Sequence, residues 1–275
     1  GDNYPPDRRA AFFSKSLLLS VGVAALSGFI GSSILEKDIE YYPLIFTFLG
    51  FCAFSKAAAI YCMPSKQVDK SPHENPFGNM KYAWQDRSFG YVLLTWFIMG
   101  FANLWTLPLR VDYVTSSQWG IEGSAIFVAM IITVIPEIMR MLLIPFWARL
   151  FDKMNFVILR MILNLSFAAG VLLFFISSNP WIIGAGSALI GAAFAGGSIA
   201  WNLWVTKYAP PGKTGAYMSV HVSLTGIRGT LGPMIGYWAI GLIGAQNIGI
   251  LSCAMMILAT LMLIPEIKHG RWKTA

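Results

Sequence analysis

The sequence has few charged residues: Asp, Glu, Lys and Arg make up 12% of its 275 residues, whereas 56% are apolar. Soluble globular domains carry about 25% charged residues, so this composition excludes an ordinary soluble enzyme. It also excludes a disordered chain, because long apolar runs stand where disorder requires polar tracts. The mean hydropathy of +0.61 is typical of a protein whose solvent is the lipid bilayer.

Motifs for catalysis and for cofactors are also missing. The sequence has no Gly-rich phosphate-binding loop, no zinc-ligand cluster and no Ser-His-Asp set that could be argued to meet. Its three cysteines, Cys52, Cys62 and Cys253, lie in apolar runs without the spacing of metal ligands. We therefore predict no enzymatic activity, no cofactor and no metal ion.

Eight apolar stretches are present, at about 12–35, 41–63, 88–111, 124–148, 155–177, 181–206, 215–243 and 246–267. A membrane-spanning helix needs roughly 20 apolar residues, and lipid offers the backbone no hydrogen-bond partner. The sequence thus predicts an all-α membrane protein with eight transmembrane helices.

Basic residues gather on one side of these stretches. Fifteen of the 20 Lys and Arg fall there: Arg8, Arg9, Lys15, Lys66, Lys70, Lys81, Arg87, Arg149, Lys153, Arg160, Lys207, Lys213, Lys268, Arg271 and Lys273. The opposite side holds Lys37, Arg110, Glu36, Asp38, Glu40, Asp112 and Glu122. Basic loops face the cytoplasm, so we expect both termini there, in a plasma or inner membrane. Lipid headgroups account for the net charge of +7, and nucleic acid is not a predicted partner.

The sequence also contains an internal repeat, a common feature of membrane transporters. Residues 5–31 align without gaps on residues 210–236 with eight identities in 27 positions, beginning with Pro5-Pro6 on Pro210-Pro211. The same offset places the start of the second stretch on the start of the eighth. Stretches one and two therefore correspond to stretches seven and eight.

Two loops resemble motifs of the major facilitator superfamily. Residues 148–155 (ARLFDKMN) are similar to the family's loop G-x-L-small-D-basic-x-G, although Ala148 and Asn155 replace Gly and Phe156 replaces a basic residue. Residues 209–215 (APPGKTG) resemble the loop before the fifth helix of a half. The resemblance implies two six-helix halves, of which this chain would supply helices five to twelve, with the first four helices absent.

On this resemblance, residues 1–63 are the last two helices of the N-terminal half, residues 64–87 are the cytoplasmic loop between the halves, and residues 88–275 are the complete C-terminal half. The resemblance also implies a gating loop formed by Arg149, Asp152 and Lys153. Asp152 is expected against the beginning of the first stretch, where free N–H groups attract an anion.

Charged residues within the membrane need an explanation, because each costs about 2.5–3.5 kcal/mol at the centre of a helix. Glu137 and Arg140 lie three residues apart on one face of the fourth stretch. Either they form a self-neutralising pair that stabilises packing, or they line a water-filled cavity where Glu137 can carry a proton.

Arg228 lies near the centre of the seventh stretch, which contains no acidic residue. At 100° per residue it shares a polar stripe with His221 and Thr225. Two interpretations remain open: Arg228 belongs to a substrate site, or it pairs with Glu137 across helices.

Trp96 and Asn103 share a face of the third stretch, deep enough to stack on a ligand and hydrogen-bond it. Trp201 and Trp204, near the cytoplasmic end of the sixth stretch, are more typical of interfacial anchors.

These observations predict a secondary transporter that moves a small polar or anionic solute across the bilayer by alternating access, coupled to protons or to sodium ions. The candidate substrate pathway consists of Trp96, Asn103, Glu137, Arg140, His221, Thr225 and Arg228. The alternative is a membrane scaffold or assembly factor that has the same fold and does not transport. The fold does not identify the solute, because one fold serves many functions.

Overall fold

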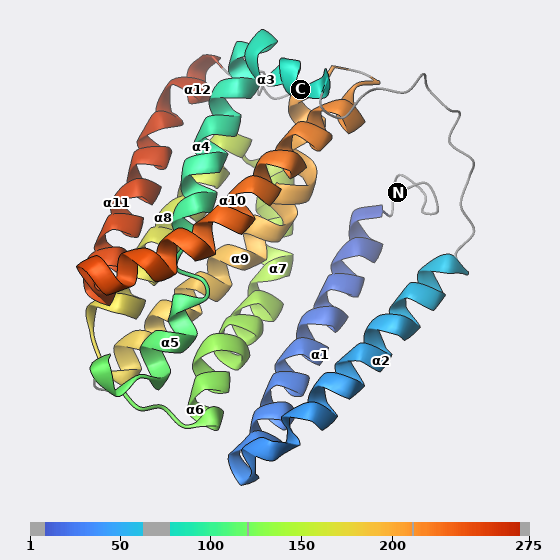
Figure 1. The fold of residues 1–275 in the computed structure, drawn as a ribbon. Helices are drawn as coiled ribbons and strands as arrows, with labels where there is room; N and C mark the ends of the chain where they lie inside the picture. The colour runs from blue at the N-terminus through green and yellow to red at the C-terminus, as the bar shows by residue number, and fades with distance from the viewer. Residues whose placement is uncertain (1–8, 63–77, 120, 211, 270–275) are drawn as a thin grey trace.

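The structure is a computed structural model that describes residues 9–62, 78–119, 121–210 and 212–269, and within these ranges every regular element is a helix (Figure 1). The long helices are α1 (Arg9–Lys37), α2 (Tyr42–Tyr61), α4 (Arg87–Leu104), α7 (Ile135–Lys153), α8 (Phe156–Ile176), α9 (Pro180–Tyr208), α10 (Thr214–Ile243) and α11 (Ala245–Met262). Shorter helices are α3 (Tyr82–Gln85), α5 (Leu109–Thr115), α6 (Ala125–Ala129) and α12 (Ile264–His269). The predicted all-α architecture is confirmed.

Seven of the apolar stretches form helices that are long and apolar enough to cross a membrane within the described residues: 16–37, 39–61, 87–115, 125–151, 156–176, 180–206 and 245–268. The remaining stretch, at 215–243, forms α10, which is 30 residues long but carries His221, Arg228 and several glycines. The protein is therefore an integral membrane protein. The count of eight crossings and the division into halves stay predictions, and Pro64 to Phe77 of the predicted inter-half loop lie outside the described residues.

Two of the spans are interrupted at prolines. The third span breaks at Trp105–Pro108 between α4 and α5, because a proline disfavours helical geometry in the residue before it. In the fourth span a π-helical turn, Met130–Val134, separates α6 from α7. Pro136 follows this turn, and its missing N–H cannot continue the regular hydrogen-bond ladder. Both irregularities lie toward the same end of the bundle, away from α3 and α12 (Figure 1).

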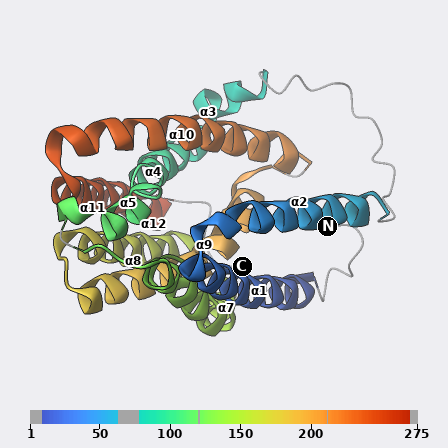
Figure 2. The same ribbon diagram turned by 60° about the horizontal axis from the view of Figure 1, so that its bottom comes forward.

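The helices pack closely where glycines remove side chains. A Cβ on Gly186 of α9 would lie 2.7 Å from the backbone nitrogen of Phe174 on α8, so these helices meet backbone to backbone. On the other side of the bundle α1 packs along α6 and α7, and a Cβ on Gly28 would lie 2.7 Å from Cγ2 of Thr133. Helix α2 lies outside this packing and has no buried residue (Figure 2).

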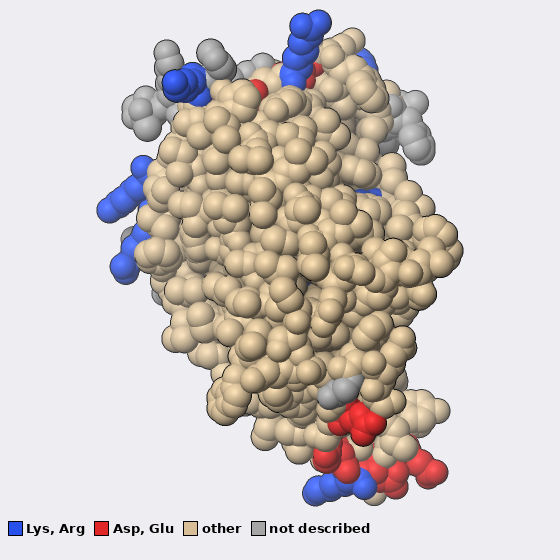
Figure 3. Space-filling model, turned by 90° about the vertical axis from the view of Figure 1, so that its left-hand side faces the viewer, with Lys and Arg blue, Asp and Glu red and all other residues tan. Residues whose placement is uncertain are grey.

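Charged side chains gather at the two ends of the bundle (Figure 3). The end with α3 and α12 carries mainly Lys and Arg, which also appear on the flank below it, and the opposite end carries a cluster of Asp and Glu beside basic atoms. Most of the surface between them in this view is uncharged. This pattern matches a protein whose middle contacts lipid and whose ends contact headgroups and water.

Candidate functional site

A cavity of about 400 Å³ lies where α4, α8, α9 and α10 meet, with Leu17 of α1 on a further side. Its polar lining residues are Asn103, Arg160, Ser198, Thr225 and Arg228. Four of the residues predicted for the substrate pathway line it: Trp96, Asn103, Thr225 and Arg228. The structure therefore brings together predicted residues from two separate helices, and it adds Arg160 to them.

Arg228 lies on α10 and is buried, with 6% of its surface exposed. Its Nη1 donates to the backbone carbonyl of Trp96, and its Nη2 donates to Oγ1 of Thr225 at 3.1 Å. The guanidinium lies flat against α4 at Gly100, where a Cβ would come within 2.7 Å of Nε and closer still to Cζ. A glycine at this position thus makes room for the arginine.

Arg160 lies on α8, and only 3% of its surface is exposed. Its guanidinium stacks 3.5 Å above the ring of Trp96, and Nη2 contacts the Met99 sulfur at 3.1 Å. A thioether is a weak acceptor, and a cation–π contact contributes about 0.5–2 kcal/mol. Among the described residues, Arg160 therefore leaves most of its hydrogen-bonding capacity unused.

The charge pattern of the sequence places Arg160 among the basic residues that flank the cytoplasmic turn, because it lies one turn after the start of α8. The structure shows that its long side chain points inward from that turn. Asn164, one turn later on the same face, is also buried, with 1% of its surface exposed. Two polar residues spaced i, i+4 in an apolar helix are the sequence signal that could have identified this face.

Neither cavity arginine has a carboxylate at salt-bridge distance among the described residues. Glu137 instead pairs with Arg140 at 2.6 Å on its own helix, and Nη2 of Arg140 is 3.4 Å from Oγ of Ser198. Of the two interpretations of Arg228, cross-helix pairing with Glu137 is therefore wrong. Glu137 and Arg140 do not line the cavity, although Arg140 contacts its wall through Ser198.

Asn103 contributes a directed amide to the cavity. Arg110, expected at the outer face, is buried on α5 with 5% exposed, and its Nη2 donates to Oδ1 of Asn103 at 2.8 Å. A guanidinium can only donate, so it fixes the amide oxygen and leaves the amide N–H groups to face other partners. Arg110 thus orients Asn103 across the break between α4 and α5.

His221 lies outside the cavity lining, with 1% of its surface exposed. The centroids of three indole rings surround its ring, those of Trp96 at 5.3 Å, Trp201 at 5.4 Å and Trp204 at 5.2 Å. The residues of the predicted polar stripe on α10 therefore have different surroundings. Thr225 and Arg228 line the cavity, while His221 packs against aromatic rings.

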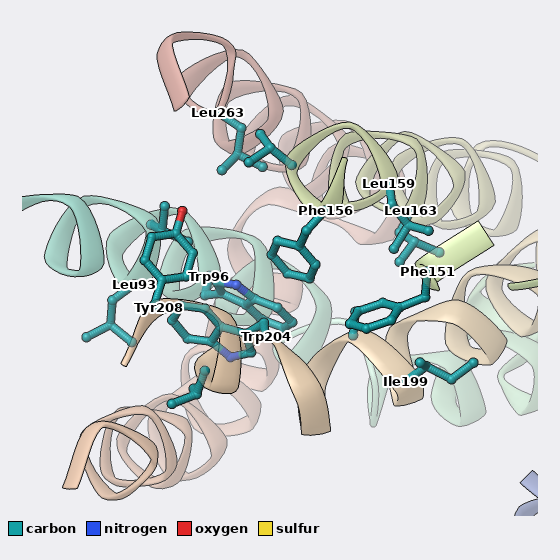
Figure 4. Close-up of a cluster of buried hydrophobic side chains, with 14 of the residues drawn as sticks. Leu93, Trp96, Phe151, Phe156, Leu159, Leu163, Ile199, Trp204, Tyr208 and Leu263 are labelled. Carbon is teal, nitrogen blue, oxygen red and sulfur yellow. The ribbon is translucent and has the colours of Figure 1, made fainter. Parts of the chain in front are cut away.

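The two tryptophans of α9 differ from the expected interfacial anchors. Trp204 is fully buried and stacks on Trp96 with ring centroids 5.5 Å apart, and both lie in one cluster of hydrophobic side chains (Figure 4). Trp201 lines the cavity. Ring contacts with Trp96 of α4 and His221 of α10 place both rings inside the bundle, which the position of a residue near a helix end does not reveal.

The predicted gating loop lies at the end of α7, where Arg149 and Lys153 are exposed. The side chain of Asp152 is outside the described residues, and so are the side chains at the beginning of α1. The contact between Asp152 and α1 stays a prediction.

The sequence profile of the Major Facilitator Superfamily matches residues 116–275, more than half of the chain. The chain belongs to the major facilitator superfamily. The matched range includes α8, α9 and α10, three of the four helices that form most of the cavity wall. Curated proteins gave no match.

Members of the major facilitator superfamily are generally transporters and not enzymes, so the chain has a membrane transporter fold. Among the described residues, no cluster of His, Cys, Asp and Glu could hold a metal ion. The chemistry that the cavity offers is that of two guanidinium groups and an amide.

Proposed function

We propose that the protein is a secondary transporter that moves a small anionic solute by alternating access, with Arg160 and Arg228 as its anion-binding pair. One observation carries this proposal: both guanidinium groups line a single cavity, and no carboxylate of the described residues neutralises them. An unneutralised charge in a low-dielectric medium is costly, and a solute anion supplies the missing partner.

The hydrogen bonds of the cavity also favour an anion. The hydroxyl of Thr225 donates to the carbonyl of His221 at 2.9 Å, and that of Ser198 donates to the carbonyl of Phe194 at 2.8 Å. Both hydroxyl hydrogens are thereby used within their own helix. The guanidinium and amide groups of Arg160, Arg228 and Asn103 keep donors for a solute, and ionised acceptors form the strongest hydrogen bonds with such donors.

The packing of α1 supports alternating access. Leu17 of α1 contributes to the cavity wall, and α1 also packs against the π-helical turn and α7. A movement of α1 relative to α7 would change access to the cavity. The Glu137–Arg140 pair lies on α7, next to the cavity wall, where it can gate the cavity or couple transport to protons or sodium ions.

We further propose that the end bearing α3 and α12 faces the cytoplasm, since Lys and Arg predominate there (Figure 3). Both termini would then be cytoplasmic, in a plasma or inner membrane. Among the described residues no contact favours the scaffold alternative, which does not require two arginines without a carboxylate partner in a cavity.

The test is ligand binding by purified protein, read from the thermal midpoint of unfolding with added phosphate, butyrate or 4-phenylbutyrate. We expect at least one anion to raise the midpoint. Arg160→Lys and Arg228→Lys should abolish this increase while each keeps its positive charge, because the forked donor geometry is lost. Arg87→Lys, at the exposed first residue of α4, is the matched control. The proposal is refuted if no anion raises the midpoint. It is also refuted if the increase persists in both lysine variants.

A further inference from the structure

The cavity has two chemically different ends. The arginine end is built around Trp96, whose ring contacts Arg160 and whose carbonyl accepts from Arg228. Further along α8, Phe167 lines the cavity seven residues after Arg160, which is two helical turns or about 10 Å. The lining of the cavity along α8 therefore changes from charged at Arg160 to aromatic at Phe167.

Two aromatic rings line the far end, and the Asn103 amide is the polar lining group two turns beyond Trp96 on α4. Phe167 and Phe194 meet edge to face there, with ring centroids 4.9 Å apart and an interplanar angle of 87°. Phe167 is buried, with 3% exposed, whereas Phe194 is partly exposed. Leu104 of α4 is a further apolar lining residue, and Leu17 of α1 packs against the cluster that contains Trp96.

This lining disfavours a solute that is polar on all sides. An inorganic anion or a sugar acid would place oxygens against phenyl and leucine side chains that cannot hydrogen-bond them. Such unpaired polar groups lose about 1–3 kcal/mol each. An apolar group in the same place would release water from both surfaces.

We infer that the solute is an organic anion with an apolar body about the size of one ring or a short chain. Its acidic headgroup lies between Arg160 and Arg228, and its body lies against Phe194 and Phe167. The volume of about 400 Å³ is near the lower limit of pockets that hold small molecules, and it accommodates a solute of this size. This inference rests on the proposed function and specifies the substrate class of the same site.

Three matched probes test it on the purified protein in detergent. They are 4-phenylbutyrate, butyrate, which lacks the ring, and 4-phenylbutanamide, which lacks the charge. We expect 4-phenylbutyrate to bind at least about tenfold more tightly than butyrate, because burial of a phenyl ring contributes that much or more. The amide should bind at least about tenfold more weakly than the acid, because it cannot form charge-assisted hydrogen bonds. Phenyl phosphate and inorganic phosphate repeat the comparison for a phosphate headgroup.

Phe194→Ala locates the apolar body. We expect this variant to lower the affinity for 4-phenylbutyrate about five- to tenfold and to leave the affinity for butyrate within about twofold. Phe146→Ala is the matched control, because Phe146 is 52% exposed on the outer face of α7. If Phe194→Ala unfolds the protein, Phe194→Leu, which keeps an apolar side chain but removes the ring, should lower the phenyl preference.

The outcomes separate the two proposals. Equal binding of butyrate and 4-phenylbutyrate, each dependent on Arg160 and Arg228, would overturn this inference and leave the anion site standing. Tighter binding of inorganic phosphate than of phenyl phosphate would do the same. Equal binding of the acid and the amide would refute the anion site itself.

Discussion

Gly100→Ala should disable the candidate anion site without removing any polar group. The new methyl group would lie 2.7 Å from Nε of Arg228 and closer to Cζ, which is shorter than any tolerable contact. The guanidinium must then leave the surface of α4. Its hydrogen bonds to the Trp96 carbonyl and the Thr225 hydroxyl would break.

The expected magnitude follows from two opposing effects. Replacing glycine by alanine within a helix normally stabilises it by about 0.5–1 kcal/mol. Two hydrogen bonds from a charged donor contribute about 1.5–3 kcal/mol each, but a displaced guanidinium regains part of this in the cavity. We therefore expect the free energy of unfolding to fall by roughly 1–3 kcal/mol. The affinity for 4-phenylbutyrate should fall at least about tenfold.

The assay is thermal unfolding of the purified protein with and without 4-phenylbutyrate. Gly226→Ala, two residues before Arg228 on α10, is the matched control, because a Cβ there meets no atom within 4 Å. Gly100→Ala should have little effect in an Arg228→Ala background, where no guanidinium remains to collide with. Equal stability and binding in Gly100→Ala and Gly226→Ala would refute the reasoning, and so would an undiminished effect of Gly100→Ala in the Arg228→Ala background.

Two further predictions concern the ion pair and the orientation. Glu137→Gln leaves partly buried Arg140 without its carboxylate and should lower the free energy of unfolding by about 1–3 kcal/mol. Adding Arg140→Gln should restore much of this loss. Thermal unfolding that shows no recovery in the double variant would contradict the prediction. In a cysteine-free background, an impermeant thiol reagent applied to intact cells should label Glu40→Cys and spare Lys268→Cys. The opposite labelling pattern would reverse the proposed orientation.

The helices could be predicted closely from the sequence. The stretch expected at about 155–177 is α8, Phe156–Ile176, and the stretch expected at 215–243 is α10, Thr214–Ile243. Lipid satisfies no backbone hydrogen bond, so any long apolar run in a bilayer must form a helix regardless of its neighbours. The interruptions at Trp105–Pro108 and Met130–Val134 were less predictable, because neighbouring helices decide whether a membrane proline kinks or breaks its helix.

The candidate site was only partly predictable. Arg228 and Asn103 could be identified because a polar residue in the middle of an apolar run is costly and needs a reason. The sequence determined that such residues exist and on which helices. It did not determine which of them meet: Arg160 and Arg228 converge on Trp96 from α8 and α10, while His221 is enclosed by indole rings one to two turns away from Arg228. Helical periodicity fixes the direction of a side chain relative to its own axis, whereas the rotation and crossing of packed helices decide what that side chain contacts.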